Sequence, residues 1–455
     1  MRKTPRNLTA QMERSIEMAL APGHVISYKA NFDFARTPAA KQIALLVLAE
    51  PKGAVSLYES FLAGCYAKAE EIDDSSGSFG QFVGELFCAW IKARQASGAD
   101  PDKTAARLLA WMDNDSYGFC YQLEKDAAKI LDRAGRAAFE TQVRARFDAT
   151  TTTSAAGESS RRNTDYQRRR CSEMLRAIYL NQNDVGAYIR LCEATQLTGQ
   201  DCHALATMLV AQRKSEEALT WVERGLVLDK QNPYGSMAGH DLARLKRGLL
   251  KKLGRGNEAL EAAWAEFHKH PSKYSYDDLM KYVPKQERAA WHEKAMDAAR
   301  TADLHSLMQL LLETKELERL ADLVGQNKDG ALEDVSHCTT EPAAKKLEKT
   351  HPEAAARLWC TQGMRVIKAK KSKYYGAALE NFERARRCYE RAGLINDWQR
   401  VVNEVRSEHY RKTGFMSGFE EVVAGSGRSE KTSFLERAKA RWSAPQDGPK
   451  YRGVE

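Results

Sequence analysis

The chain of 455 residues carries 70 lysines and arginines against 61 aspartates and glutamates, so its formal net charge is +9. This length predicts about two to four structural units, and a composition with 43% hydrophobic and 29% charged residues is ordinary for a globular protein. The modest positive charge permits nucleic acid or acidic partners without requiring them.

Cysteine usage and hydropathy exclude two classes of protein. The nine cysteines are scattered singly without a C-x-x-C pair, which favours reduced core thiols over a disulfide framework. The longest apolar run, Ile43 to Ala49, is far shorter than the about 20 residues that span a bilayer. Residues 1–20 are too charged for the core of a signal peptide. We therefore expect a cytoplasmic protein without a membrane segment.

Residues 1–148 are predicted to form an N-terminal helical domain. Alanine, leucine, glutamate, lysine and arginine dominate and β-branched runs are few, which favours helix throughout. Asp100 before Pro101 has the residue types of a helix N-cap and first turn. The aromatic segment 117–121 is predicted to pack as an elbow between helices, with a pocket wall as the alternative.

The clearest change of pattern lies at 149–165. Threonine and serine crowd the stretch from Asp148 to Asn163, apolar periodicity is lost, and turn-forming residues appear. This composition predicts a linker or flexible loop. An arginine cluster lies beside it: Arg161, Arg162, Arg168, Arg169 and Arg170.

From residue 166 to residue 425 the pattern predicts helix pairs. Between Cys202 and Pro233, small and aliphatic residues recur at helical spacing on two successive helices: Leu205, Ala206, Leu209, Ala218, Val222 and Gly225. This segment resembles a tetratricopeptide repeat, a helix–turn–helix unit of about 34 residues. Weaker copies are centred on Ala259, Ala289 and Leu317. Because their spacing is uneven, we expect an irregular, tetratricopeptide-like α-solenoid.

The stretch from Pro352 to Gly425 predicts three amphipathic helices in succession. The middle helix combines small and aromatic residues on one face: Ala377, Ala378, Phe382, Ala385, Cys388 and Tyr389. Small residues allow a second helix to approach closely, and aromatic residues fill the groove that remains. Because none of the three helices can bury its apolar face alone, they predict stacked helical hairpins. Residues 426–455 are expected to form a basic, partly flexible tail.

Two segments give the repeats a more specific resemblance. They are RKSEEAL at 213–219 and YGAALENFERARRCYERAG at 375–393. Together they resemble a bacterial α-helical family without an assigned activity, whose repeats are similar to those accompanying SWIM-type zinc-finger domains. The resemblance covers about residues 171–425 and implies the fold only. The zinc finger itself needs C-x-C followed by C-x-H, and the chain contains neither.

No catalytic, cofactor or metal motif is complete. The stretch from Gly425 to Thr432 imitates a phosphate-binding loop, but Glu430 stands where the second glycine is required, and its charge and Cβ oppose a phosphate. Neighbouring pairs such as Cys202 and His203 point about 100° apart on a helix and lack zinc-ligand spacing. Neither G-x-S-x-G nor H-E-x-x-H occurs. We therefore assign no catalytic, cofactor-binding or metal-binding residue.

The most informative polar feature is a stretch rich in basic residues and tyrosine. Its candidate interaction surface comprises Arg365, Lys368, Lys370, Lys371, Lys373, Tyr374, Tyr375, Arg384 and Arg387. Basic side chains interleaved with tyrosines are able to contact phosphates and to stack on bases. In the alternative interpretation, the lysines form a solvated turn between helices, and the arginines cap carbonyl groups or pair with Glu380 and Glu383.

The sequence predicts a non-enzymatic helical-repeat scaffold that binds a protein or peptide partner. A nucleic-acid-associated protein that uses the arginine and lysine clusters is the first alternative. An enzyme with an unrecognised pocket is the second. Partner identity, pathway and oligomeric state do not follow from the sequence.

Overall fold

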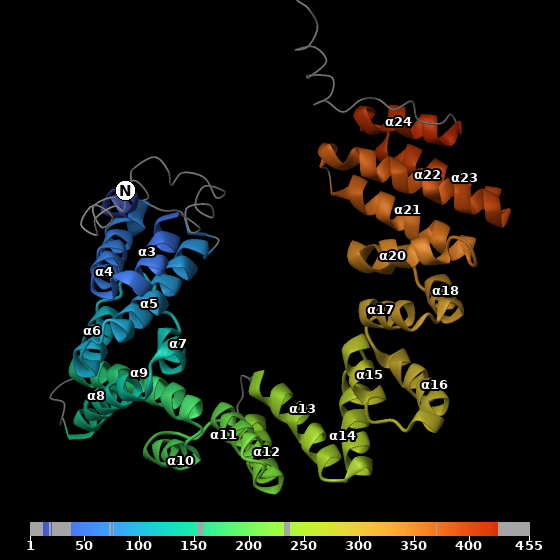
Figure 1. Ribbon diagram of the computed structural model, residues 1–455. Helices are drawn as coiled ribbons and strands as arrows, with labels where there is room; N and C mark the ends of the chain where they lie inside the picture. The colour runs from blue at the N-terminus through green and yellow to red at the C-terminus, as the bar shows by residue number, and fades with distance from the viewer. Residues whose placement is uncertain are drawn as a thin grey trace, which may run out of the picture. The chain divides into compact units, whose positions relative to one another are not determined.

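The computed structural model describes residues 12–17, 20, 38–71, 74–75, 77–152, 158–231, 237–369 and 371–425. Every regular element in these ranges is a helix, which confirms the predicted all-α class (Figure 1). The chain divides into two compact units, residues 1–254 and residues 255–455. The predicted tail at 426–455 and the candidate residue Lys370 lie outside the described ranges.

Unit 1 is built from helices that pack against their neighbours along the chain, such as α4 on α5, α8 on α9 and α11 on α12. In chain order the helices are α3 (Pro38–Ala49), α4 (Pro51–Lys68), η1 (Ala69–Glu71), α5 (Ser78–Ala96), α6 (Pro101–Asp113), α7 (Leu123–Ile130), α8 (Arg133–Thr152), α9 (Glu158–Gln182), α10 (Val185–Ala194), α11 (Gly199–Ala211), α12 (Ser215–Lys230) and α13 (Met237–Lys252). The predicted cap of α6 is confirmed, because the Asp100 carboxylate accepts hydrogen bonds from the backbone N–H groups of Asp102 and Lys103.

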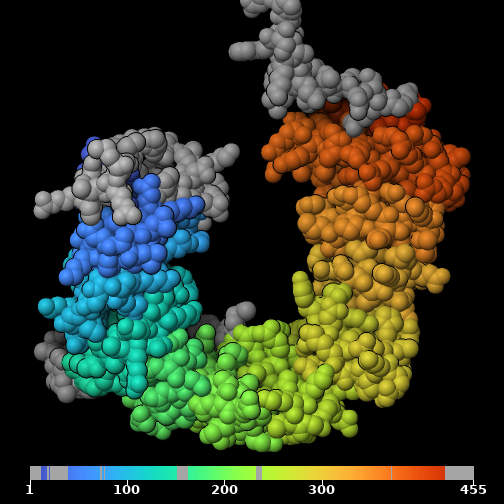
Figure 2. All heavy atoms as spheres, in the orientation of Figure 1, coloured from blue at the N-terminus to red at the C-terminus, as the bar shows by residue number. Residues whose placement is uncertain are grey.

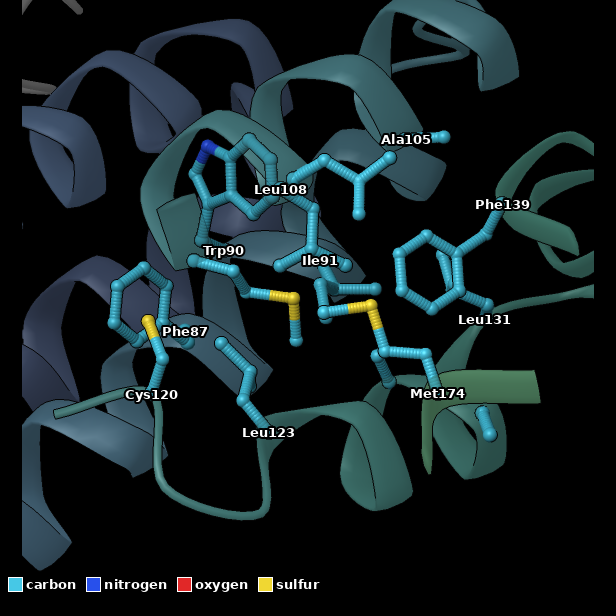
Figure 3. Packing of buried hydrophobic residues seen from close by; sticks show 14 of the residues in the cluster. Phe87, Trp90, Ile91, Ala105, Leu108, Cys120, Leu123, Leu131, Phe139 and Met174 are labelled. Atoms are coloured by element: carbon cyan, nitrogen blue, oxygen red, sulfur yellow. The ribbon is translucent and has the colours of Figure 1, made fainter. Parts of the chain in front are cut away.

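One hydrophobic core occupies most of unit 1. Figure 3 shows Phe87 and Trp90 of α5, Leu108 of α6, Phe139 of α8 and Met174 of α9 converging on a shared interior. Buried residues of the same core extend along the sequence to Met208 in α11. Large aromatic and aliphatic side chains supply most of the free energy of such a core, because each one removes a wide apolar area from water.

Most of the predicted linker at 149–165 is helical, because 149–152 belong to α8 and 158–165 belong to α9, and these two helices pack against each other. The helix α8 ends at Thr152 and α9 begins at Glu158, while 153–157 lie outside the described ranges. Both helices contribute to the core of unit 1. A domain boundary at this position stays a prediction.

The hairpin of α11 and α12 has the packing that the repeat pattern predicts. The six residues of the predicted stripe are all buried: Leu205, Ala206, Leu209, Ala218, Val222 and Gly225. A Cβ at Gly225 would lie 2.7 Å from the Cβ of Cys202 and 2.8 Å from the side chain of Leu242. Glycine is therefore required where α12 crosses α11 and α13.

Unit 2 repeats the same local packing with a different set of helices. In chain order they are α14 (Gly256–Lys269), α15 (Lys273–Met280), η2 (Lys285–Glu287), α16 (Arg288–Ala298), η3 (Ala299–Thr301), α17 (Leu304–Thr314), α18 (Leu317–Gln326), α19 (Asp329–Asp334), α20 (His337–Leu347), α21 (Pro352–Lys368), η4 (Ser372–Tyr374), α22 (Tyr375–Ala392), α23 (Ile395–His409) and α24 (Thr413–Val423). The helix α21 packs on both α20 and α22, and α22 packs on α24, so that these helices form successive layers (Figure 1). Their side chains close the gaps between the ribbons (Figure 2).

The contact between α21 and α22 joins a small residue to an aromatic one. A Cβ at Gly363 would lie 2.7 to 2.9 Å from the ring atoms of Phe382. That ring is fully buried and packs edge-on against Phe419 of α24, with ring centroids 5.2 Å apart. The predicted combination of small and aromatic residues therefore holds these helices together.

Two details of the predicted repeat pattern are wrong. Ala377 is exposed, and Leu379 occupies a buried position of α22 instead, because the apolar face is centred one residue further along the helix. Ala289 is also exposed, since α16 buries Ala295 and Met296 rather than its first turn. In α16 and α22, the buried face therefore differs from the one that the repeat pattern predicts.

Candidate functional site

Five of the predicted surface residues line two separate hollows of unit 2. The first, here called the turn hollow, has a volume of about 360 Å³. It is lined by His337, Gln362, Arg365, Val366, Ala369, Lys371 and Tyr374. The second, here called the α22 hollow, has a volume of about 410 Å³. It is lined by Glu348, Glu380, Glu383, Arg384, Arg387, Cys388 and Arg391.

The arginines of the α22 hollow are paired with carboxylates. Arg384 lies 3.2 Å from Glu380, and Arg387 contacts Glu383. For these two arginines, the pairs agree with the alternative interpretation, and such pairs four residues apart stabilise a helix surface. The α22 hollow is therefore electrically balanced by its own side chains.

Glu348 connects this hollow to the core. Its carboxylate accepts a hydrogen bond of 3.0 Å from Nε1 of Trp359 and lies 3.6 Å from Arg384. The Arg384 guanidinium also lies over the Trp359 ring, 4.9 Å from its centroid. Arg391 donates a hydrogen bond of 2.6 Å to the backbone oxygen of Glu348. These contacts tie the end of α20 to α21 and α22.

The turn hollow has a different electrostatic character, because none of its lining residues is acidic. The Arg365 guanidinium donates one hydrogen bond of 2.7 Å to the backbone oxygen of Val335. The Lys371 side chain is exposed, and among the residues that the structure describes no ion pair or hydrogen bond engages its ammonium group. Positive charge at this hollow is therefore uncompensated by the lining.

A buried amide and apolar groups complete the turn hollow. Gln362 is only 6% exposed, and its Nε2 donates a hydrogen bond to the hydroxyl of Thr340. Val366 and Ala369 contribute aliphatic surface next to the ring of Tyr374. Neither Gln362 nor Val366 is among the residues predicted for the interaction surface. A glutamine within an otherwise apolar stripe is the signal that was available, because buried polar groups require a partner.

The remaining predicted surface residues are engaged by the fold. Lys368 forms an ion pair of 2.8 Å with Glu333, and this hydrogen bond raises the pKa of the lysine. The Lys373 ammonium lies over the ring of Tyr374, 4.8 Å from the centroid. The ring of Tyr375 packs against Phe415 with centroids 5.5 Å apart. These contacts leave Lys371 as the least committed cation of the described part of this surface.

The second basic cluster, on α9, is also divided between structural and exposed residues. Arg168 donates a hydrogen bond of 2.6 Å to the backbone oxygen of Ala194, and Arg170 contacts the backbone oxygen of Met112. Arg162 and Arg169 are exposed. The side chain of Arg161 lies outside what the structure describes.

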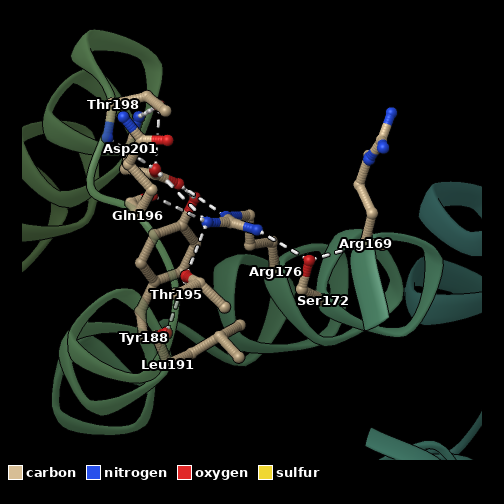
Figure 4. A network of polar contacts seen from close by, with 9 residues as sticks. All are labelled: Arg169, Ser172, Arg176, Tyr188, Leu191, Thr195, Gln196, Thr198 and Asp201. Atoms are coloured by element: carbon tan, nitrogen blue, oxygen red, sulfur yellow. Dashed lines mark hydrogen bonds and ion pairs between the residues drawn. The ribbon is translucent and has the colours of Figure 1, made fainter. Parts of the chain in front are cut away.

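A buried ion pair lies at the junction of α9, α10 and α11 (Figure 4). Asp201 is 3% exposed, and its carboxylate accepts hydrogen bonds of 2.7 Å from Nε of Arg176 and 3.0 Å from the hydroxyl of Tyr188. Thr198 donates its hydroxyl to the other carboxylate oxygen at 2.8 Å and caps α11. Every acceptor position of this carboxylate has a donor, so the network fixes three helices and offers no free group for chemistry.

Three buried thiols that lie near polar groups are held in the unreactive form. Burial raises the pKa of Cys120 to about 12, although the Tyr66 hydroxyl lies 3.7 Å from its sulfur. Burial likewise raises the pKa of Cys192 to about 12 and that of Cys388 to about 11. Because the thiolate is the nucleophile and the metal ligand, these protonated thiols are poor candidates for either role. In the described ranges, no group of three or more His, Cys, Asp or Glu residues is placed to hold a metal ion.

None of the described helices is long and apolar enough to cross a membrane. No curated protein matches the sequence significantly. Among solved structures, the chain is similar to one in a structure of Naa15/Naa10 bound to HypK-THB, at 13% identity over 96% of this chain and 71% of that chain, with a TM-score of 0.35.

Two further solved structures show similar coverage. The tetratricopeptide-repeat domain of P58(IPK) matches at 11% identity over 86% of this chain and 98% of that chain, with a TM-score of 0.19. A circular tandem repeat protein matches at 10% identity over 92% of this chain and 97% of that chain, with a TM-score of 0.19. The sequence profile of a family of unknown function, DUF6880, matches residues 31–417. The chain belongs to the DUF6880 family.

Proposed function

We propose that this protein is a non-enzymatic helical-repeat scaffold that binds a protein or peptide partner through unit 2. The observation that carries the proposal is the turn hollow. It is lined by the apolar residues Val366 and Ala369 and by the exposed side chain of Lys371. The rest of the predicted surface is used by the fold itself. A surface that the fold leaves unused, in a helical array, fits the recognition of another chain.

The layered arrangement of unit 2 supports this proposal. Each of α20, α21 and α22 packs mainly on its neighbours, so the sides of the layers that face no helix are available for a partner. Repeat proteins use such surfaces because the local packing supplies stability independently of what is bound.

The alternative of a nucleic-acid-associated protein receives less support. It requires arginines and lysines that are free to contact phosphates. Arg384 and Arg387 are paired with carboxylates, while Arg168 and Arg170 donate to backbone oxygens. These four arginines are thus already engaged within the fold.

Two finer expectations belong to this proposal. A cytoplasmic location fits the nine free cysteines, of which Cys338 is the exposed one. A relation of the repeats to those that accompany SWIM-type zinc fingers stays a prediction from sequence and adds no metal chemistry here.

We also propose that residues 149–165 form an accessible boundary. Arg162 is exposed at the start of α9, so limited digestion with trypsin is expected to cut first near Arg161 and Arg162 and to leave two stable fragments. First cleavage elsewhere, or loss of both fragments, would contradict a boundary at this position.

Affinity capture from the native host, followed by mass spectrometry, tests the scaffold proposal. The full chain serves as bait, with and without nuclease treatment of the extract. A protein partner that survives nuclease supports the scaffold. Loss of every partner after nuclease would contradict it and favour association with nucleic acid.

A further inference from the structure

The two hollows of unit 2 differ in what their charges face. In the α22 hollow, Arg384 and Arg387 face Glu380 and Glu383 within the hollow itself. In the turn hollow, Arg365 and Lys371 line a cavity whose lining contains no carboxylate. A negatively charged ligand therefore gains attraction in the turn hollow without displacing an existing ion pair.

The uncharged residues that line the turn hollow indicate which groups a ligand needs besides negative charge. Gln362 is buried, and one of its two amide N–H groups is occupied by Thr340. A carboxamide has a second N–H and an acceptor oxygen, which is the hydrogen-bonding pattern of a peptide group. Val366 and Ala369 add aliphatic surface beside it. This combination fits a peptide backbone together with one apolar side chain.

The rim supplies the charge. A guanidinium has five N–H donors, and Arg365 has given one of them to the Val335 oxygen at 2.7 Å. Lys371 also lines the hollow. Its side chain is exposed, and it follows the end of α21 in the chain. The volume of about 360 Å³ lies near the lower end of ligand pockets, which run from about 300 to 1,000 Å³, so it fits a few residues rather than a folded surface.

We propose that the turn hollow binds an acidic peptide segment of a partner protein, with an apolar side chain against Val366 and Ala369 and carboxylates at Arg365 and Lys371. This assignment rests on the proposed scaffold function and adds the chemistry of the partner.

The tyrosines argue for a peptide rather than a nucleic acid. Binding of single strands requires aromatic rings on which successive bases stack. The Tyr374 ring carries the Lys373 ammonium at 4.8 Å, and the Tyr375 ring packs against Phe415. The packed Tyr375 ring is not free to stack, and the exposed Tyr374 ring alone does not supply rings for successive bases.

Fluorescence anisotropy with the full chain tests the proposal. The probe is a fluorescein-labelled peptide of alternating glutamate and leucine, with the same peptide carrying glutamine in place of glutamate as the neutral comparison. An oligothymidylate of similar length is the second comparison. We expect the acidic peptide to bind more tightly than both, with a Kd that rises with salt concentration.

Two substitutions place the binding in the hollow. Lys371→Glu reverses the uncommitted charge and is expected to raise the Kd for the acidic peptide about tenfold. Ala369→Glu adds bulk and negative charge at an exposed lining position and is expected to have a similar effect. Lys349→Glu is the matched control, because Lys349 is also exposed but does not line the hollow, and its Kd is expected to stay at the wild-type value.

The outcomes separate this proposal from the scaffold function. Equal weakening by Lys371→Glu and Lys349→Glu would overturn the assignment of the hollow. Tighter binding of the oligothymidylate, lost in Lys371→Glu, would overturn the peptide in favour of nucleic acid. No binding of the acidic peptide, while host capture still returns a nuclease-resistant protein partner, would overturn the acidic chemistry and leave the scaffold function standing.

Discussion

The turn hollow and the α22 hollow both contain basic side chains, yet these cations have different surroundings. In the α22 hollow, Arg384 and Arg387 are bound to carboxylates of the same helix. In the turn hollow, Lys371 has no such partner among the described residues. The comparison shows that positive charge counted along a sequence is not the charge available to a ligand. We infer that paired cations stabilise the fold and that the uncommitted cation contributes to binding.

The Arg176–Asp201 pair of unit 1 is a paired cation whose carboxylate is almost completely buried. Asp201→Ala would leave the Arg176 guanidinium without its carboxylate and the Tyr188 hydroxyl without its acceptor. Because a buried charge without a partner is costly, we expect the free energy of unfolding to fall by about 3 kcal/mol in chemical denaturation. Asp241→Ala is the control, since its pair with Arg244 is exposed. An equal loss in both variants would mean that burial of the pair does not matter.

Glu348 provides the test within the α22 hollow. Glu348→Ala removes the acceptor of the Trp359 indole N–H and the carboxylate near Arg384, so we expect a loss of about 1–3 kcal/mol in the free energy of unfolding. Glu380→Ala removes a more exposed partner of the same arginine and is expected to cost less than about 0.5 kcal/mol. If the two variants were equally stable, the hollow would not be tied to the core through Glu348.

Acid pH is expected to weaken the packing around the C-terminal end of α23. Burial lowers the pKa of His409 below its usual value of 6.5, and the nearby Lys412, whose Nζ lies 3.3 Å from Nδ1, adds to this effect. The unfolded chain therefore takes up a proton near pH 6.5 that the folded chain resists, and stability falls as the pH drops below that value. The slope from this one group does not exceed about 1.4 kcal/mol per pH unit.

Several charged side chains also influence His409, including Glu408 and Lys368. Chemical denaturation of the wild type and of His409→Gln at a series of pH values isolates the contribution of the histidine. The stability difference between the two proteins should change in favour of the variant as the pH falls from 7 towards 5. A constant difference across this range would contradict the lowered pKa.

Removal of the uncommitted charge is expected to have the smallest effect on stability. Lys371→Gln breaks no ion pair among the described residues, so its free energy of unfolding should stay within about 0.5 kcal/mol of the wild type. Thermal unfolding followed by circular dichroism measures this directly. A large fall in the melting temperature would show that Lys371 belongs to the fold and not to a binding surface.

The fold was largely predictable because its signals are local. Helical spacing of apolar residues identified the buried faces of α11, α12 and most of α22, and Asp100 identified the start of α6. The errors at Ala289 and Ala377 arose where a helix turns another face inward, which depends on its neighbours and not on its own sequence.

The candidate site was predictable only in part. The sequence identified the basic stretch, and the possible pairs of Arg384 and Arg387 followed from spacings of four residues on one helix. The pair of Lys368 with Glu333 spans 35 positions, and the meeting of His337 with Lys371 in one hollow depends on how α20 packs on α21. Contacts of this kind follow from the tertiary fold, so residue types and spacing did not reveal them.

The most direct test of the central claim compares Lys371→Gln with Arg387→Gln, which remove one positive charge each from the two hollows. The measurement is the salt dependence of the Kd for the acidic peptide probe with the full chain. We expect Lys371→Gln to weaken binding and to flatten the dependence on salt, while Arg387→Gln leaves both as in the wild type. Equal effects of the two substitutions, or an effect of Arg387→Gln alone, would contradict the distinction between paired and uncommitted charge.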